Sequence, residues 1–162
     1  TLANLRRHPF ACVSYTVDVR IFAGCVTGRR RDWPVTPAAT VPGFRLEAAL
    51  AHSELEVVEV VEDEVRPRFR CRERHRAMHR PFLGFNRAQA AVLEGAILVS
   101  RLRLLPWQKI EREVDYLRIA VDKTAGETER EAWDWLMDAV ERYRQAAPER
   151  PAEARSDGRT RG

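Results

Sequence analysis

The spacing of apolar residues changes near residue 85 from the period of a strand to that of a helix. Before this point, residues 65–72 alternate between apolar side chains and arginines, which places the two kinds on opposite faces of a strand. After it, apolar residues recur three or four positions apart. Strands followed by helices predict an α+β chain whose two kinds of structure are segregated.

The first half reads as a series of strands and turns. Residues 9–17 are rich in β-formers, while residues 18–44 carry glycines and prolines that predict short pieces broken by turns. Residues 53–62 and 65–72 predict a hairpin joined at residues 63–64. Pro67 has no N–H to donate, which favours an edge strand or a bulge for the second of these strands.

The second half predicts three helices. Asn86 followed by Gln89 resembles a capping box, with Asn86 as the N-cap of a helix that runs to about Arg103. Because this helix is apolar nearly all round, we expect it at the buried centre of the helical part. Pro106 suits the first position of the next helix, and Gly126 ends it.

Each of the remaining two helices has one apolar face, or stripe. The first stripe consists of Ile110, Val114, Leu117 and Val121. Thr128 with Glu131 predicts a capping box for the last helix. The inner face of that helix consists of Trp133, Leu136, Val140 and Tyr143. From Ala147 onward no apolar residue is larger than alanine or proline, so residues 147–162 are predicted to be a disordered tail.

Composition narrows the class of protein. Hydrophobic residues make up 44% of the 162 residues, enough for a packed core. No apolar run approaches the roughly 20 residues needed to span a bilayer, and no signal peptide opens the sequence. Three widely spaced cysteines fit neither a disulfide framework nor a zinc motif. We therefore expect reduced cysteines and a cytoplasmic protein without a membrane partner.

Residues 64–80 hold seven arginines against two glutamates. Such a patch could meet phosphate or nucleic acid, so a noncatalytic binding or interaction module built on residues 66–76 is the alternative function. An arginine-lined edge strand that resists aggregation is the structural interpretation. Phe69 is predicted on the opposite face, which removes a stacking platform and makes nucleic acid an unexpected partner.

A metal site would need Cys71, His75 and His79 to lie close together. They would converge only in a helix, whereas the residues before them predict a strand. The arginines between them would repel a divalent cation, and zinc normally has four well-spaced ligands. The sequence therefore predicts no metal. It contains no legible nucleophile elbow or phosphate-binding glycine loop, so catalytic residues are not predicted.

Three segments resemble known families. The opening Thr1-Leu-Ala-Asn4-Leu5 resembles the T-x-x-N-L segment of FMN-binding split barrels. The run Arg80-Pro-Phe-Leu-Gly-Phe-Asn86-Arg87-Ala88, before the apolar helix, resembles the domain-of-unknown-function family numbered 447. The pattern from Tyr116 to Gly126, followed by an acidic helix with Ala132-Trp133, is similar to the same family.

The resemblance implies part of an FMN-binding split β-barrel at residues 1–79 and a small all-helical C-terminal domain at residues 80–146. It implies an FMN-binding flavoprotein, with an oxidoreductase reaction of unspecified substrate as the activity that the flavin allows. Because the barrel's first strands precede the T-x-x-N-L segment in such families, we expect further strands before Thr1. A homodimer is expected because split barrels complete their flavin site between subunits.

Four residues are candidates for contact with the flavin. A Thr1 hydroxyl, an Asn4 amide and free N–H groups at a helix start form a phosphate cradle. The same two residues are also ordinary helix caps, and this interpretation stays open. Asn86 and Arg87 are weaker candidates from the helical part. Asn86 as an N-cap, with Arg87 in a solvated first turn, is the favoured structural alternative.

Overall fold

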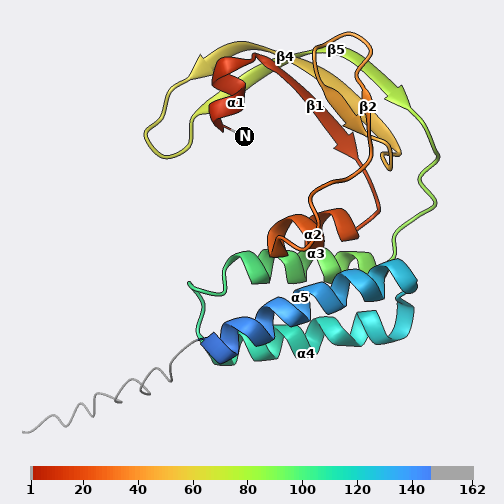
Figure 1. Cartoon of the computed structure of the whole chain (residues 1–162), viewed down its shortest axis with the longest axis vertical. Helices are drawn as coiled ribbons and strands as arrows, with labels where there is room; N and C mark the ends of the chain where they lie inside the picture. The colour runs from red at the N-terminus through yellow and green to blue at the C-terminus, as the bar shows by residue number, and fades with distance from the viewer. Residues whose placement is uncertain (1, 147–162) are drawn as a thin grey trace, which may run out of the picture.

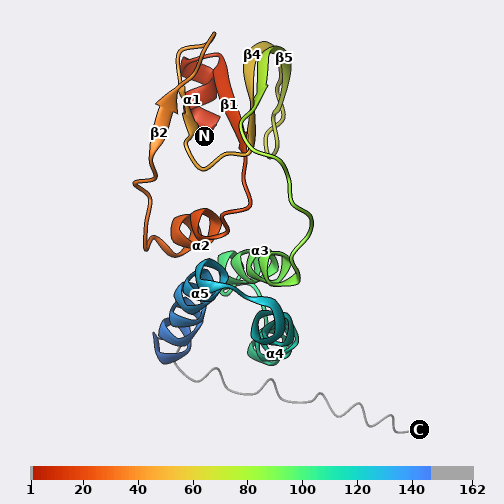
Figure 2. The same cartoon turned by 90° about the vertical axis from the view of Figure 1, so that its right-hand side faces the viewer.

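The computed structural model describes residues 2–146, so the predicted phosphate contact of Thr1 and the predicted disordered tail lie outside the described residues. Figures 1 and 2 show a sheet region that stands on a layer of helices. The elements are α1 Leu2–Arg7, β1 Phe10–Tyr15, α2 Arg20–Thr27, β2 Val35–Pro37, β3 Phe44–Leu46, β4 Ala51–Val61, β5 Arg68–Met78, α3 Arg87–Ser100, α4 Trp107–Thr124 and α5 Glu127–Ala146.

The main sheet is antiparallel, with the strand order β1-β4-β5. The predicted strand after residue 9 is confirmed as β1, and the predicted hairpin is confirmed as β4 and β5. Its connection is longer than predicted, because the Asp63 carboxylate accepts the N–H groups of Val65 (2.9 Å) and Arg66 (2.7 Å) and closes a turn there. β5 lies at the edge, as Pro67 suggested.

Two irregularities interrupt the pairing of β4 with β5. One lies between Val57 and Glu59 on β4. The other places Leu55 opposite Glu73 and Glu54 opposite His75, which leaves Arg74 as an extra residue on β5. A bulge of this kind shifts the following side chains to the other face of the sheet. His75 therefore faces the same way as Glu54, and Arg76 faces the opposite way with Ser53.

The prediction of irregular structure for residues 18–44 missed helix α2. This helix is short and has a glycine inside it, so its own propensity is weak. Packing against α3 and α5 holds it in place (Figure 1). Arg20 pairs with Asp18 (2.7 Å) and reaches Glu131 on α5 (3.3 Å). Gly28 ends the helix at a φ of 72°, which favours glycine.

Helix α3 lies at the centre of the helical layer, in contact with α2, α4 and α5, as predicted. It is not buried all round, because Leu93 and Ile97 are 37% and 44% exposed. The Asn86 side chain caps it by accepting the N–H of Ala88 at 2.8 Å. The predicted return bond of Gln89 is wrong, because its amide donates to Glu129 on α5 instead (3.0 Å). A Cβ at Gly95 would lie 3.1 Å from the side chain of Leu136, so glycine allows α3 and α5 to approach closely.

Helices α4 and α5 bury the predicted stripes. Ile110 and Leu136 are fully buried, while Leu117 and Tyr143 lie at the margin of the core. Pro106 stands one residue before α4 as its N-cap. The capping interaction of α5 begins two residues earlier than predicted, at Gly126 instead of Thr128. The Glu129 carboxylate accepts the N–H of Gly126 at 3.0 Å, which is the return bond of a capping box.

Candidate functional site

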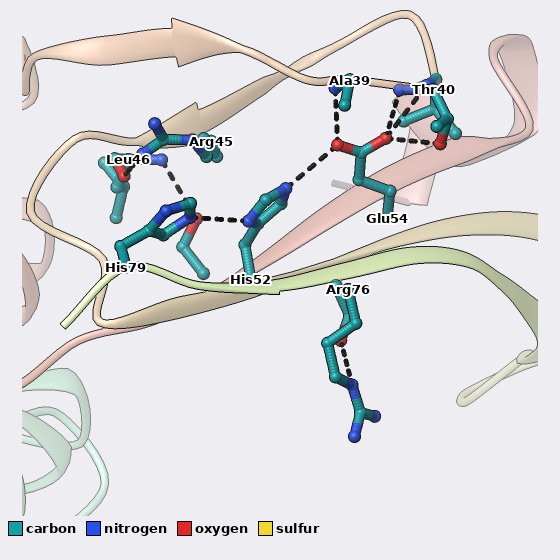
Figure 3. Close-up of polar contacts among 11 residues, drawn as sticks. Ala39, Thr40, Arg45, Leu46, His52, Glu54, Arg76 and His79 are labelled. Atoms are coloured by element: carbon teal, nitrogen blue, oxygen red, sulfur yellow. Dashed lines mark hydrogen bonds and ion pairs between the residues drawn. The ribbon is translucent and has the colours of Figure 1, made fainter. Parts of the chain in front are cut away.

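The buried centre of the sheet is polar. His52 and Glu54 on β4 are 3% and 0% exposed, and both lie on the face covered by the loop between β2 and β3 (Figure 3). Their spacing of two residues explains the shared face, because side chains alternate along a strand. Ser14 of β1 lies on the same face, opposite His52. A charged group in such a place is costly unless its hydrogen bonds are all made.

The Glu54 carboxylate is held by the loop at residues 39–41. Oε1 accepts the N–H of Ala39 at 2.6 Å. Oε2 accepts the N–H of Thr40 at 2.6 Å, its hydroxyl at 2.6 Å and the N–H of Val41 at 3.1 Å. Burial alone would raise the pKa of Glu54, but the bonds from Thr40, Ala39 and His52 outweigh it and hold that pKa far below its usual range. Glu54 is therefore an ionised buried carboxylate.

His52 lies between Glu54 and His79. Its Nε2 is 3.0 Å from Oε1 of Glu54, and its Nδ1 is 2.9 Å from Nε2 of His79. The carboxylate can only accept, so Nε2 of His52 carries a proton in this arrangement. The rings of His52 and His79 are nearly parallel, with an interplanar angle of 12°. The three side chains form a hydrogen-bonded chain from the buried carboxylate to the protein surface.

His79 forms the outer end of this chain and is exposed. Desolvation is the largest cause that lowers the pKa of His79, followed by the positive charge of Arg45 and the neighbouring His52 and Arg80. Neutral His79 can accept or donate a hydrogen bond at Nε2, according to its tautomer. An imidazole pair next to an ionised carboxylate can hold and transfer a proton.

His75 completes the cluster from β5. One nitrogen of His75, one nitrogen of His52 and one carboxylate oxygen of Glu54 lie within 4.8 Å of one another. The rings of His52 and His75 are 5.7 Å apart between centroids. Imidazole and carboxylate groups can bind a divalent metal ion or relay protons. Of the three residues that the sequence suggested as possible metal ligands, His75 and His79 both lie next to His52. The third, Cys71, is exposed elsewhere on β5.

His52 and Glu54 are not among the site residues predicted from the sequence. The available signal was the pair His-x-Glu at the start of the strand predicted for residues 53–62, with His52 one residue before it. Alternation along a strand would place both groups on one face. Nothing in the sequence indicated that the loop at residues 39–41 would cover them. The position of His75 depends on the bulge at Arg74, which has no simple sequence signature.

The predicted flavin contacts lie in two places. Asn4 is exposed on α1, beside the sheet, whereas Asn86 and Arg87 begin α3 in the helical layer (Figures 1 and 2). The structure does not bring Asn4 next to the other two. Asn86 is engaged twice, because its carbonyl caps α3 and its amide donates to the Thr124 carbonyl (3.3 Å). Arg87 is exposed in the first turn, as the structural alternative expected.

Three of the five arginines of β5 form ion pairs with acidic neighbours. Arg70 pairs with Glu59 (3.1 Å) and Arg74 with Glu56 (3.1 Å). Arg76 pairs with Glu73 (2.7 Å) and also approaches the hydroxyl of Ser53 (3.3 Å) on the face opposite Glu54 (Figure 3). These pairs reduce the positive charge that the strand presents to a phosphate backbone.

Within residues 2–146, none of the helices combines the length and apolar character needed to cross a membrane. No protein of curated function matches the chain. Among solved structures, the crystal structure of an FMN-bound protein from Methanosarcina mazei, assigned to the family DUF447, has a similar fold. The TM-score is 0.70 at 15% identity, over 85% of this chain and 74% of that chain. This likeness confirms the predicted α+β fold class.

Both parts of the chain match one family in sequence. Residues 1–80 match the N-terminal domain of the family described as protein of unknown function (DUF447). Residues 86–138 match the second model of that family, its C-terminal part. The two matches follow one another along the chain in the order of strands and helices described above. The resemblance identified in the sequence is confirmed, and the chain belongs to the DUF447 family.

Proposed function

We propose that this protein binds FMN as a flavoprotein of the split-barrel type. The observation that supports the proposal most strongly is the fold shared over 85% of the chain with an FMN-bound member of the same family. FMN supplies redox chemistry, and a protein in this role positions the flavin and tunes its electronics. An oxidoreductase reaction is the activity that follows from such binding.

The phosphate of FMN is assigned to the segment around α1, with Thr1 and Asn4 as ligands. Asn4 is exposed, and no other residue of the described chain occupies its side-chain amide. A neutral amide that donates to a phosphate forms a charge-assisted hydrogen bond. Arg7 in the same helix adds positive charge.

Arg87 and Asn86 are the proposed contacts from the helical layer. Arg87 is exposed, and its guanidinium is well suited to phosphate or to the carbonyl groups of a flavin ring. Asn86 already makes two hydrogen bonds within the protein, so it contacts the flavin less readily than Arg87 does. Contacts from both regions require either a long ligand or a second subunit.

A cytoplasmic homodimer is the proposed assembly. β1 and β5 are the two edges of the main sheet, and the face opposite Glu54 carries exposed apolar side chains. Val13, Tyr15 and Met78 are 39%, 50% and 78% exposed. A second copy that covered them would bury apolar area and complete a flavin site between subunits.

The test is a titration of the flavin-free protein with FMN and with riboflavin, followed by the change in flavin fluorescence. FMN should bind more tightly than riboflavin, because only FMN carries the phosphate. Asn4→Ala should weaken FMN binding by about 1–3 kcal/mol, the range for a lost bond to a charged group. Riboflavin should bind the variant and the wild type equally.

Three results of this titration would count against the proposal. Absence of FMN binding by the dimeric protein would refute FMN binding itself. An equal loss of riboflavin and FMN affinity in Asn4→Ala would show that Asn4 supports the fold. Equal affinity of the wild type for the two ligands would show that the phosphate is not recognised.

The alternative function is an interaction module that uses the arginines of β5. Its support is the exposure of this edge strand, and the ion pairs of Arg70, Arg74 and Arg76 weigh against it. Nonspecific attraction to phosphate falls steeply with salt. Salt-sensitive retention on nucleic acid, in a protein that does not bind FMN, would favour this alternative.

A further inference from the structure

We propose that His52, Glu54 and His75 form a binding site for one divalent transition-metal ion of the zinc type. The three side chains come from β4 and β5 and present one ligating atom each within 4.8 Å of one another. Two imidazoles and one carboxylate form a donor set that zinc uses in sites with an open fourth position. This site is separate from the residues proposed to contact FMN.

The spacing needs only a small adjustment. Ligands of a tetrahedral zinc ion lie about 3.4 Å apart when each bond is about 2.1 Å. Nε2 of His52 and Oε1 of Glu54 are already 3.0 Å apart. The ligating nitrogen of His75 lies within 4.8 Å of the other two ligating atoms, so a shift of this half-buried side chain on the edge strand brings the three to the spacing of a zinc site.

The charges at the site favour a cation. Glu54 is a carboxylate that is completely buried. Among the residues that the structure describes, its ion pair is with His52 and not with a lysine or an arginine. The loop N–H groups satisfy the carboxylate by hydrogen bonds but carry no formal charge. A metal ion that replaces the proton between Nε2 of His52 and Glu54 adds a formal positive charge beside the carboxylate.

Arg76 of β5 is directed away from this site. The bulge at Arg74 places Arg76 on the opposite face, where it contacts Ser53 and Glu73 (Figure 3). Arg74 itself pairs with Glu56. Arg74 and Arg76, on either side of His75, thus have acidic partners of their own, which weakens the repulsion of a cation expected from the arginine content. Arg45 of β3 remains as a positive charge near His79.

The surroundings also orient the proposed ligands. The bonds from Thr40 and Val41 hold Oε2 of Glu54, while Oε1 accepts the N–H of Ala39 at 2.6 Å and is also directed at His52. With Nε2 of His52 on the metal, its Nδ1–H donates to Nε2 of His79 (2.9 Å). Metal-bound histidines usually donate their second N–H to an acceptor in this way, which fixes the ring. His79 thus acts as a positioning residue for His52.

The chain provides a matched control, because His8 is the one histidine outside the cluster and is exposed. The full-length protein, stripped with a chelator and free of flavin, is titrated with Zn²⁺ by calorimetry and with Co²⁺ by absorption spectroscopy. One ion per chain should bind, and Co²⁺ should give the intense visible bands of a four-coordinate site. His75→Ala and His75→Gln should each weaken binding at least tenfold, while His8→Ala should leave it unchanged.

The folding of each variant is checked by circular dichroism and by its melting temperature without metal. His75 is on the sheet edge, so both variants should fold. Zn²⁺ should raise the melting temperature of the wild type and of His8→Ala but not of the His75 variants. No binding by the wild type, or equal affinity in the wild type and the His75 variants, would overturn the proposal. Neither result depends on whether FMN binds.

Discussion

The sheet region and the helical layer bury different kinds of residue. In the helical layer the fully buried large side chains are apolar, with Ile110 and Leu136 at the centre. In the sheet region the most deeply buried side chains of β4 are His52, Ser53 and Glu54. Apolar burial stabilises a fold without requiring a particular partner, whereas buried polar groups need every bond to be made. The helices therefore provide stability, and the sheet holds groups that can do chemistry.

The first prediction addresses the helical side of this comparison. Leu136→Ala should lower the free energy of unfolding by about 2–5 kcal/mol, because it removes a fully buried side chain from between α3 and α5. Leu104→Ala changes a residue that is 80% exposed and serves as the control. Urea denaturation followed by circular dichroism measures both. A loss as small as that of the control would show that the helical core is not the main source of stability.

The second prediction addresses the polar centre of the sheet. Glu54→Gln should lower the free energy of unfolding by about 1–3 kcal/mol. The amide nitrogen of glutamine cannot accept a hydrogen bond from the loop N–H groups, so at least one donor is left unpaired. Glu47→Gln, at an exposed carboxylate, should change nothing measurable. Urea denaturation with a chelator present keeps the comparison independent of metal. If both variants matched the wild type, the bonds to Glu54 would contribute nothing to stability.

The third prediction concerns how the difference in unfolding free energy between the wild type and Glu54→Gln depends on pH. The pKa of Glu54 is lower in the folded protein than its unfolded value of 4.5. The stability contributed by this group is therefore fully present above pH 4.5 and is lost as the pH falls towards the folded pKa. The wild type should lose its advantage over Glu54→Gln as the solution is acidified below that value. A difference that stayed constant with pH would show that Glu54 is not ionised in the fold.

The helical layer could largely be predicted from the sequence, because its information is local. The Asn86 cap and the stripe from Ile110 to Val121 depend on residues three or four positions apart. The capping box of α5 was placed two residues late, since Thr128 and Glu131 have the same spacing as Gly126 and Glu129. Helix α2 was missed because tertiary packing, rather than propensity, stabilises it.

The polar cluster could not be predicted in the same way, because it depends on long-range pairing. Glu54 meets its donors 13 to 15 positions earlier in the chain, and His52 meets His79 27 positions later. The face on which His75 lies is set by the bulge at Arg74. A single extra residue reverses the alternation from which strand faces are inferred. Only the shared face of His52 and Glu54 was available from the sequence.

The fourth prediction separates the chain's two asparagines, which belong to the two regions compared. Asn86→Ala should lower the free energy of unfolding by about 1 kcal/mol, because α3 loses its N-cap. Asn4→Ala should have little effect on stability, since its exposed amide supports no described element. Urea denaturation of both variants without flavin is the measurement. A larger loss of unfolding free energy in Asn4→Ala than in Asn86→Ala would contradict the capping role given to Asn86.

The fifth and smallest prediction concerns the charged surface of the sheet. Arg74→Ala removes the ion pair between Arg74 and Glu56, whose side chains are 50% and 32% exposed respectively. The free energy of unfolding should therefore fall by only about 0.2–1 kcal/mol. Salt screens such a pair, and the loss should shrink at high ionic strength. Arg118→Ala, at an exposed position on α4, is the control. A loss well above 1 kcal/mol that persisted at high salt would mean that Arg74 maintains the bulge itself. The face of His75 would then depend on this arginine, and the surface of the sheet would contribute to the site as directly as its buried centre.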